Sequence, residues 1–454
     1  MVGDIDFTDL TDKVLKSAKA DEVEIVVISK DTALTRYANS RIHQNIGQQD
    51  SDISIRAVFG QKVGSASTNS LDENSVKECL KRAETIAKHQ KEDPQFQGLP
   101  EHKEGRKTQN NYFKETVNYS PDQRAEKVKQ IIDFAEEKGV DRVYGAFKTE
   151  EIDLFVANSN GIEKKNKLSN ANLTTTAIAD WDNDQGFGWG EMCRANVNDI
   201  DHMKVAERAV EKGLNNMEPK SIEPGEFNVV LEPLAVKSML MYLGFMGLSA
   251  RAVQEERSFM NGKFGEQIMN EDVTIYDDAL DKDMIGFPFD YEGVPKKHID
   301  IINDGVANEV VYDSYTAGKE DDKESTGHAL PMPNPNSPLP LNLMMESGNS
   351  SVEEMIENTE KGILVTRFNY CRTVHPVKSI LTGLTRDGTW MIEDGEVKHP
   401  VKNLRFTQNL LDAFTDVEEI SDRRELYSLG YFPGYIVAPA MKIPEFNFTG
   451  TTEF

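Results

Sequence analysis

The chain has few cysteines and no long apolar segment. Its three cysteines, Cys79, Cys193 and Cys371, lie far apart, and no two of them form a Cys-x-x-Cys pair. This spacing argues against a disulfide framework and a thiolate zinc knuckle, so we expect three reduced, mostly buried thiols. The longest apolar run, Met239 to Leu248, is about half of what a bilayer span needs. We therefore predict no membrane association.

Several catalytic patterns are also missing. The sequence contains no Gly-x-Ser-x-Gly elbow and no EF-hand pattern, and no two histidines stand at metal-binding spacing. The run Gly186-Phe-Gly-Trp-Gly190 lacks the Lys-Ser/Thr of a phosphate loop, and its glycine–aromatic alternation predicts a bulged strand. His328 remains a candidate ligand contact. The alternative interpretation of His328 is an exposed loop histidine.

Acidic residues outnumber basic residues, and the formal net charge is −26. Such a charge repels a phosphate backbone, so we predict no direct nucleic-acid binding. It fits either a solvated acidic surface or a surface that meets a basic protein partner. The first residues, Met1-Val-Gly-Asp-Ile-Asp, show no basic-plus-apolar signal. We expect a cytoplasmic protein.

The length of 454 residues predicts two or three domains, because one hydrophobic core rarely serves so long a chain. A polar stretch over 91–111 and the proline-containing segment 217–225 divide the periodic parts of the sequence. We predict an N-terminal α+β domain over residues 1–110, a central α+β domain over 111–222, and a β-rich C-terminal domain over 223–454.

Local patterns predict an α+β fold whose first two domains are two βα units with an antiparallel or mixed sheet. A strand is expected over 21–29, followed by a hairpin that turns at Gly60-Gln61 and a helix from Asp72. Ser120-Pro-Asp begins a second helix that ends at about Lys138, because proline fits the first helical position. Further strands near 143–147, 152–157 and 173–179 and a helix over 202–214 complete this part.

The C-terminal domain is predicted to be β-rich with two packed helices. One helix runs from Pro233 to about Arg257, and the other from Ser351 to Lys361, where Ser351 and Glu354 match a capping box. Glu393-Asp394-Gly395 predicts a hairpin turn, because Asp-Gly tolerates positive φ. Five prolines in 331–340 favour extended backbone, which is either a cover over a cleft or a surface loop without a task.

Three C-terminal segments together resemble the TldD/PmbA family. They are Thr382 to Val397, Pro400 to Gln408 and Pro439 to Phe448, and Ala157-Asn-Ser-Asn-Gly161 and Gly348 to Glu354 look like further landmarks in family order. The resemblance extends over nearly the whole chain. Members of this family are described as zinc-metallopeptidase subunits and, under an older name, as modulators of DNA gyrase.

The resemblance implies a His-Glu-x-x-x-His helix that binds zinc, with a cysteine near the C-terminus as a further ligand. Counted back without gaps from Ser258, the motif falls on Met241 to Met246, so Met241 and Met246 take the histidine positions and Tyr242 takes the glutamate position. Thioethers bind zinc poorly. The sequence therefore resembles the metal-free branch called PmbA or TldE, and we expect these three residues to line a peptide cleft without metal.

Three hypotheses for the function follow. The first is a non-catalytic subunit that pairs with a TldD-like zinc subunit, or with itself, in a peptidase for unfolded or small peptides. In this hypothesis the chain holds no cofactor and the zinc belongs to the partner. The second is a modulator of DNA gyrase that acts through an acidic protein-binding surface. The third is a self-sufficient metallopeptidase with an unrecognised ligand set.

Overall fold

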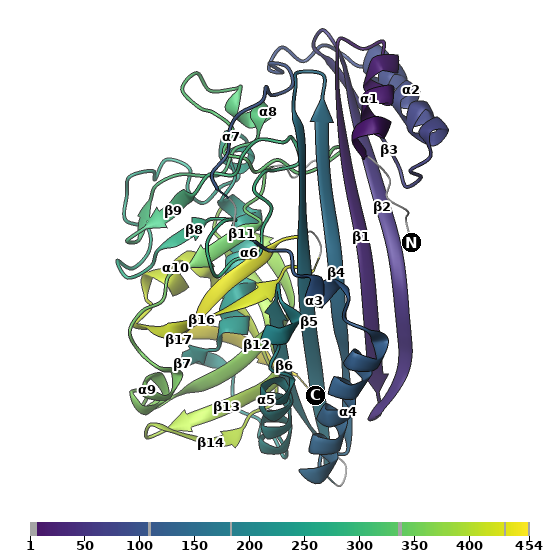
Figure 1. Ribbon diagram of the computed structural model, residues 1–454. Coiled ribbons are helices and arrows are strands. Elements are labelled where there is room, and N and C mark those ends of the chain that lie inside the picture. The colour runs from purple at the N-terminus through teal and green to yellow at the C-terminus, as the bar shows by residue number, and fades with distance from the viewer. Residues whose placement is uncertain (1–6, 108–109, 182–183, 335–337, 431–432, 453–454) are drawn as a thin grey trace.

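Two β-sheets organise the fold, and together with the helices they confirm the predicted α+β class (Figure 1). A computed structural model describes residues 7–107, 110–181, 184–334, 338–430 and 433–452. Within these residues, no helix has the length and apolar character needed to cross a membrane. Four of the five prolines in the predicted extended segment flank residues 335–337, which lie outside the described part of the chain.

The first sheet has six strands in the order β3-β2-β1-β4-β5-β6. Every neighbouring pair is antiparallel, and β1 joins the first predicted α+β unit to the second by pairing with β4. The predicted helix starts at Asp72 and Ser120 are confirmed, because both side chains cap their helices. The elements of this half are α1 (Phe7–Ser17), β1 (Glu22–Ala38), β2 (Arg41–Phe59), β3 (Lys62–Thr68), α2 (Glu73–His89), α3 (Lys114–Val117), α4 (Pro121–Glu137), β4 (Arg142–Asn158), β5 (Glu163–Trp181), β6 (Asp184–Arg194), the 3-10 helix η1 (Val197–Asp199) and α5 (His202–Asn215).

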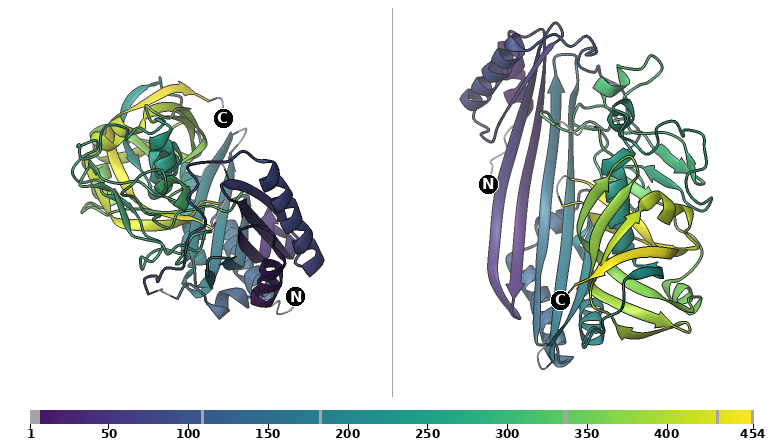
Figure 2. Two further views of the ribbon diagram at one scale, coloured as in Figure 1. Left: turned by 90° about the horizontal axis from the view of Figure 1, so that it is seen from above. Right: turned by 180° about the vertical axis from the view of Figure 1, so that it is seen from behind.

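The two faces of this sheet contact different parts of the molecule, because side chains alternate along a strand. In β1, Ile25 and Val27 pack beneath α1 and α2, whereas Val26 belongs to the core shared with the C-terminal domain. Figure 2 shows the C-terminal domain and the helices α1 and α2 on opposite sides of the long strands. Along part of its length, the first sheet is therefore covered on one face by α1 and α2 and on the other face by the C-terminal domain.

The glycine-rich run in β6 forms a regular strand, so the predicted bulge is wrong. β6 pairs with β5 without a register shift. A Cβ atom on Gly188 would lie 2.0 Å from the carbonyl oxygen of Ala209 in α5. The alternating aromatic residues face the other way, where the guanidinium of Arg367 lies 4.3 Å from the ring centroid of Trp189. The glycines let α5 pack flush on the strand, and the aromatic rings contact the C-terminal domain.

The second sheet closes on itself, because β17 pairs with both β15 and β7. β7, β12, β13, β15 and β17 thus form a ring, and α6 packs against β12 and β17. The hairpin turn is confirmed, since Asp394 and Gly395 both have positive φ. The elements are β7 (Gly225–Leu231), α6 (Pro233–Gly247), α7 (Ala250–Gln254), β8 (Ile275–Asp277), β9 (Ile299–Asn303), β10 (Val306–Ala307), α8 (Ser314–Ala317), β11 (Asn342–Met345), α9 (Val352–Glu357), β12 (Lys361–His375), β13 (Ile380–Glu393), β14 (Glu396–Pro400), β15 (Leu404–Asn409), α10 (Leu410–Thr415), β16 (Glu419–Ser428) and β17 (Tyr435–Thr451).

Two predicted helices are shorter than expected. The helix predicted to reach Arg257 is interrupted after α6, because Ser249 leaves the helix, forms a bridge with Val311 and caps α7 through Ala252 N. The predicted capping box at Ser351 is confirmed, but α9 ends at Glu357. Ser249 pairs with Val311 outside the named strands, and β12 begins at Lys361, soon after the end of α9.

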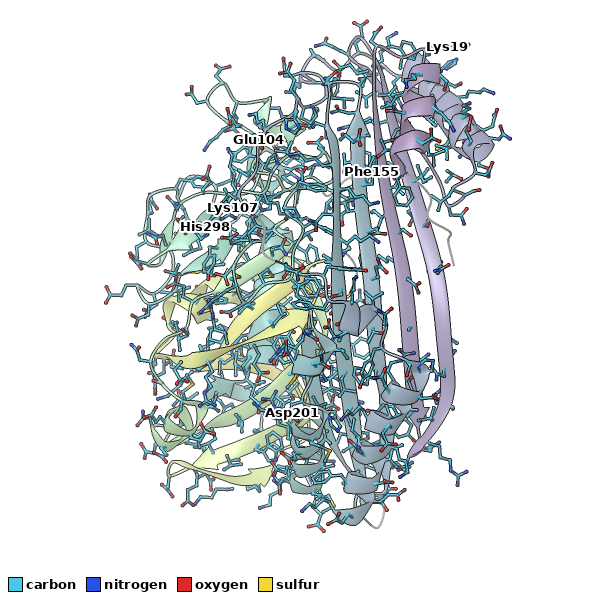
Figure 3. The ribbon with its side chains drawn as sticks, in the orientation of Figure 1. Lys19, Glu104, Lys107, Phe155, Asp201 and His298 are labelled. Carbon is cyan, nitrogen blue, oxygen red and sulfur yellow. The ribbon has the colours of Figure 1, made fainter. Side chains whose placement is uncertain are left out.

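The polar connector after α2 crosses the C-terminal domain. Arg106 donates a hydrogen bond to Asp278 over 3.1 Å, and Asn111 donates one to the carbonyl of Gly286 over 3.3 Å. His298 contacts the same Asp278 carboxylate through Nδ1 over 3.1 Å. Figure 3 shows Lys107 of the connector beside His298. The connector is therefore hydrogen-bonded to the C-terminal domain and links it to the first sheet.

Candidate functional site

One side of α6 is only partly covered by the residues that the structure describes. Its half-buried or exposed residues recur at helical spacing, whereas the residues between them lie in the main core. We call this set the α6 stripe. It consists of Leu234, Lys237, Ser238, Met241, Tyr242 and Phe245.

The structure brings together two of the three residues predicted at the degenerate metal site. Met241 and Tyr242 lie on the α6 stripe, whereas Met246 is only 2% exposed and belongs to the core. Met241 and Phe245 also line a small cavity with Leu339 and Leu429. The stripe thus offers an apolar surface, whereas Met246 lies on the opposite, core-facing side of α6.

Tyr242 connects the stripe to β12. Its hydroxyl donates a hydrogen bond to the backbone carbonyl of Cys371 over 2.5 Å. Its ring meets Phe245 edge-on, with the centroids 6.3 Å apart. Tyr242, which the sequence predicts at the family's glutamate position, therefore links the helix to the strand by a hydrogen bond.

The edge of β12 next to this contact is open. β12 pairs with β7 only as far as Val365, and beyond that point its described partner strand is β13 on the other side. Tyr370 is 73% exposed, and Val374 is 56% exposed. Residues 366–375 of β12 thus lie beside the α6 stripe with one described partner strand and exposed apolar side chains, and Tyr242 already occupies the carbonyl of Cys371.

Lys237 is the single charged residue of α6. Within the described residues it forms no ion pair, although Glu191 of β6 and Arg367 of β12 lie near enough to influence it. Burial lowers the pKa of Lys237, and Glu191 acts in the opposite direction. Lys237 could have been singled out from the sequence, because it is the one charged residue in an otherwise apolar helix.

The thiol of Cys371 is not a ready metal ligand or nucleophile. Burial raises its pKa to about 12, and the ammonium of Lys237 offsets only part of this effect. The thiol therefore stays protonated near neutral pH, whereas both zinc binding and nucleophilic attack require the thiolate. Cys79 and Cys193 are free and buried, as predicted.

His328 is buried, so its interpretation as an exposed loop residue is wrong. Its Nδ1 lies 2.9 Å from Thr326 Oγ1, and its Nε2 lies 3.0 Å from the carboxylate of Asp277 in β8. Burial lowers the pKa of His328, which keeps the imidazole neutral. His328 lies outside the α6 stripe and holds its loop against β8.

The residues of the stripe do not fit a zinc ion. They offer thioether, phenol and ammonium groups in place of imidazole, carboxylate and thiolate. Elsewhere in the described parts of the chain, no group of three or more His, Cys, Asp or Glu residues is placed to hold a metal ion. What the stripe and the β12 edge can do is bind an extended, partly apolar chain.

Comparisons with known proteins cover nearly the whole chain. Family models described as PmbA/TldA metallopeptidase domain 1, central domain and C-terminal domain match residues 23–87, 114–217 and 224–450. The metalloprotease PmbA of Escherichia coli O157:H7 is 23% identical over 440 residues, covering 94% of this chain and 93% of that protein.

Two solved structures share the fold. TldE from Thermococcus kodakarensis has a TM-score of 0.87 at 22% identity and covers 97% of this chain and 100% of its own. A Thermotoga maritima protein described as a candidate modulator of a DNA gyrase has a TM-score of 0.86 at 22% identity and covers 98% of this chain and 100% of its own. The resemblance predicted from the sequence is confirmed, and the chain belongs to the PmbA/TldA metallopeptidase family.

Proposed function

We propose that this chain is the non-catalytic, TldE-like subunit of a cytoplasmic zinc metallopeptidase that acts on unfolded or small peptides. The zinc and the catalytic base then belong to a TldD-like partner chain. One observation carries the proposal: the helix at the family's zinc position has a surface without any histidine, carboxylate or thiol. The name of the Thermococcus neighbour, TldE, agrees with this assignment.

The α6 stripe and the β12 edge give this subunit a role in holding peptide. An extended peptide can add as a further strand along the part of β12 beyond Val365, where β13 is its one described partner strand. Its apolar side chains would then lie on Met241, Phe245 and Tyr370, which are half-buried or exposed. Tyr242 keeps helix and strand at a fixed separation through its bond to Cys371.

Co-expression with the TldD-like chain of the same genome tests the pairing. We expect the two chains to elute together in size exclusion at micromolar concentration, with zinc in the complex and chelator-sensitive peptide cleavage. Self-association without the partner is the competing assembly, and the same column distinguishes it. A stoichiometric zinc ion and peptide cleavage in this chain alone would contradict the proposal.

A matched pair of variants tests the site. Phe245 is 42% exposed on the stripe, and Phe264 is 43% exposed in a loop outside it. Phe245→Asp places a charge on the peptide surface, so we expect cleavage by the complex to fall at least tenfold. Phe264→Asp is the control and is expected to keep wild-type cleavage.

The gyrase hypothesis rests on a family name and the net charge, and it stays a prediction.

A further inference from the structure

A second cavity lies away from α6 and β12. Its volume is about 750 Å³, within the range of small-molecule sites. Arg56 of β2, residues 90–96 after α2, Arg251 of α7, Tyr315 of α8 and residues 330–334 surround it. Figure 1 shows α7 and α8 near one end of the long strands of the first sheet. β2, one of these strands, contributes Arg56 to the cavity. Both the first sheet and the C-terminal domain therefore contribute walls.

The floor of the cavity contains a guanidinium group, that of Arg56, with one unpaired N–H donor within the described residues. Arg56 is 5% exposed, and its Nη2 donates hydrogen bonds to Glu24 over 2.8 Å and to Glu292 over 2.9 Å. Within the described residues its Nε has no hydrogen-bond partner. Buried donors in folded proteins are nearly always paired. Arg56 thus lacks an acceptor at a place where the structure leaves room for a ligand.

The wall beside Arg56 is apolar. Phe96 is 6% exposed and Leu330 is 2% exposed, and both line the cavity together with Val63, Tyr315 and Met332. Tyr315 is held in place, because its hydroxyl donates to Asp93 over 2.8 Å and the ammonium of Lys319 lies 4.2 Å from its ring centroid. Such a wall accepts an aromatic or aliphatic group.

The charges around the floor define the polar part of the ligand. The guanidinium of Arg56 already faces the carboxylates of Glu24 and Glu292. At the rim, Arg251 is paired with Glu255 over 2.8 Å. A third carboxylate at Arg56 would lie beside the buried carboxyl groups of Glu24 and Glu292, and this crowding of acidic groups is unfavourable. A neutral acceptor satisfies the free donor without adding charge.

We propose that this cavity binds an uncharged apolar molecule that carries a carbonyl group, such as a short hydrophobic peptide with blocked ends. The apolar group lies against Phe96 and Leu330, and the carbonyl oxygen accepts a hydrogen bond from Arg56. The site does not depend on the peptidase role, because no residue of α6 or β12 lines it.

Calorimetric titration of the full chain with N-acetyl-phenylalanine amide tests the proposal. We expect saturable binding, and binding at least tenfold weaker for N-acetyl-phenylalanine, which has the same ring but a free carboxylate. Absence of saturable binding of the amide at millimolar concentration would overturn the proposal. Tighter binding of the carboxylate would overturn it as well, because the acceptor would then be an anion.

Two methionine variants locate the binding. Met332→Glu places a charge in the apolar wall, and we expect at least a tenfold loss of affinity for the amide. Met217→Glu is the matched control, because Met217 is also half-buried but lies in the segment after α5. Equal affinity of both variants would place the ligand elsewhere and overturn the assignment. Association with a TldD-like chain is measured separately, so either proposal can fail alone.

Discussion

The hydroxyl of Tyr242 lies 2.5 Å from the carbonyl oxygen of Cys371, and this bond joins α6, which the sequence predicts to hold the family's zinc position, to β12 beside it. In a zinc-binding relative the corresponding position is implied to hold a catalytic glutamate. Here the side chain is committed to a backbone carbonyl of β12. The replacement thus exchanges a reactive group for a structural tie.

Removal of this tie should weaken the fold measurably. Tyr242→Phe deletes the donor and leaves the half-buried Cys371 carbonyl without it, so we expect a loss of about 1 kcal/mol in the free energy of unfolding. Urea denaturation followed by tryptophan fluorescence measures the change. Tyr370→Phe is the control, because Tyr370 is 73% exposed. Equal midpoints for wild type and Tyr242→Phe would contradict the structural role.

The two methionines that the sequence predicts at the family's histidine positions, Met241 and Met246, should contribute very differently to the free energy of unfolding. Met246 is 2% exposed in the core, so Met246→Ala is expected to cost about 2 to 5 kcal/mol. Met241 is half-buried on the stripe, and Met241→Ala should cost less than half as much because less contact is lost. Chemical denaturation of both variants checks the order. A larger loss for Met241→Ala would mean that the stripe is buried.

Sequence patterns predicted the elements that local chemistry defines. The caps at Asp72 and Ser120 and the turn at Asp394 are each determined by a few neighbouring residues, and all three are found. The α6 stripe could not be predicted in the same way, because α6 is apolar almost all round and its uncovered side is decided by the packing of distant strands. His328 shows the same limit, since its burial depends on Asp277 from a separate strand.

Stability should depend on pH through Glu24. Burial raises the pKa of Glu24 to about 7, although Arg56 acts in the opposite direction. The folded state therefore takes up a proton between pH 7 and the ordinary value of 4.5, so this residue adds stability as pH falls through that window and removes it as pH rises. The change amounts to about 1.4 kcal/mol per pH unit where the proton numbers differ by one.

Glu24→Gln removes this titration. We expect wild type to lose stability relative to the variant between pH 5 and pH 8, by on the order of 1 to 3 kcal/mol. Denaturation midpoints across this range measure the difference. If the difference between the two proteins stays constant with pH, Glu24 does not titrate as its burial requires.

His328 should contribute to stability because it partners a buried carboxylate. His328→Ala removes the imidazole at 3.0 Å from Asp277 and leaves this buried carboxylate with the backbone N–H of Asn342 and the charge of Lys296, so we expect a loss of about 1.5 to 3 kcal/mol. His102→Ala is the control, since the side chain of His102 is 49% exposed. Thermal denaturation compares the two variants. A small effect of His328→Ala would indicate that water or another donor satisfies Asp277.

The packing of α5 on β6 gives the sharpest test of the fold, because two glycines in extended strands have opposite surroundings. A Cβ atom at Gly188 would lie 2.0 Å from Ala209 O, whereas one at Gly47 would have nothing within 4 Å. Gly188→Ala must push α5 away from the sheet, so we expect a loss of at least about 1 to 3 kcal/mol. Gly47→Ala should leave stability unchanged or raise it by about 0.4 to 1 kcal/mol, because alanine restricts the unfolded chain. Urea denaturation of both variants tests this, and equal effects would show that α5 does not pack directly on β6.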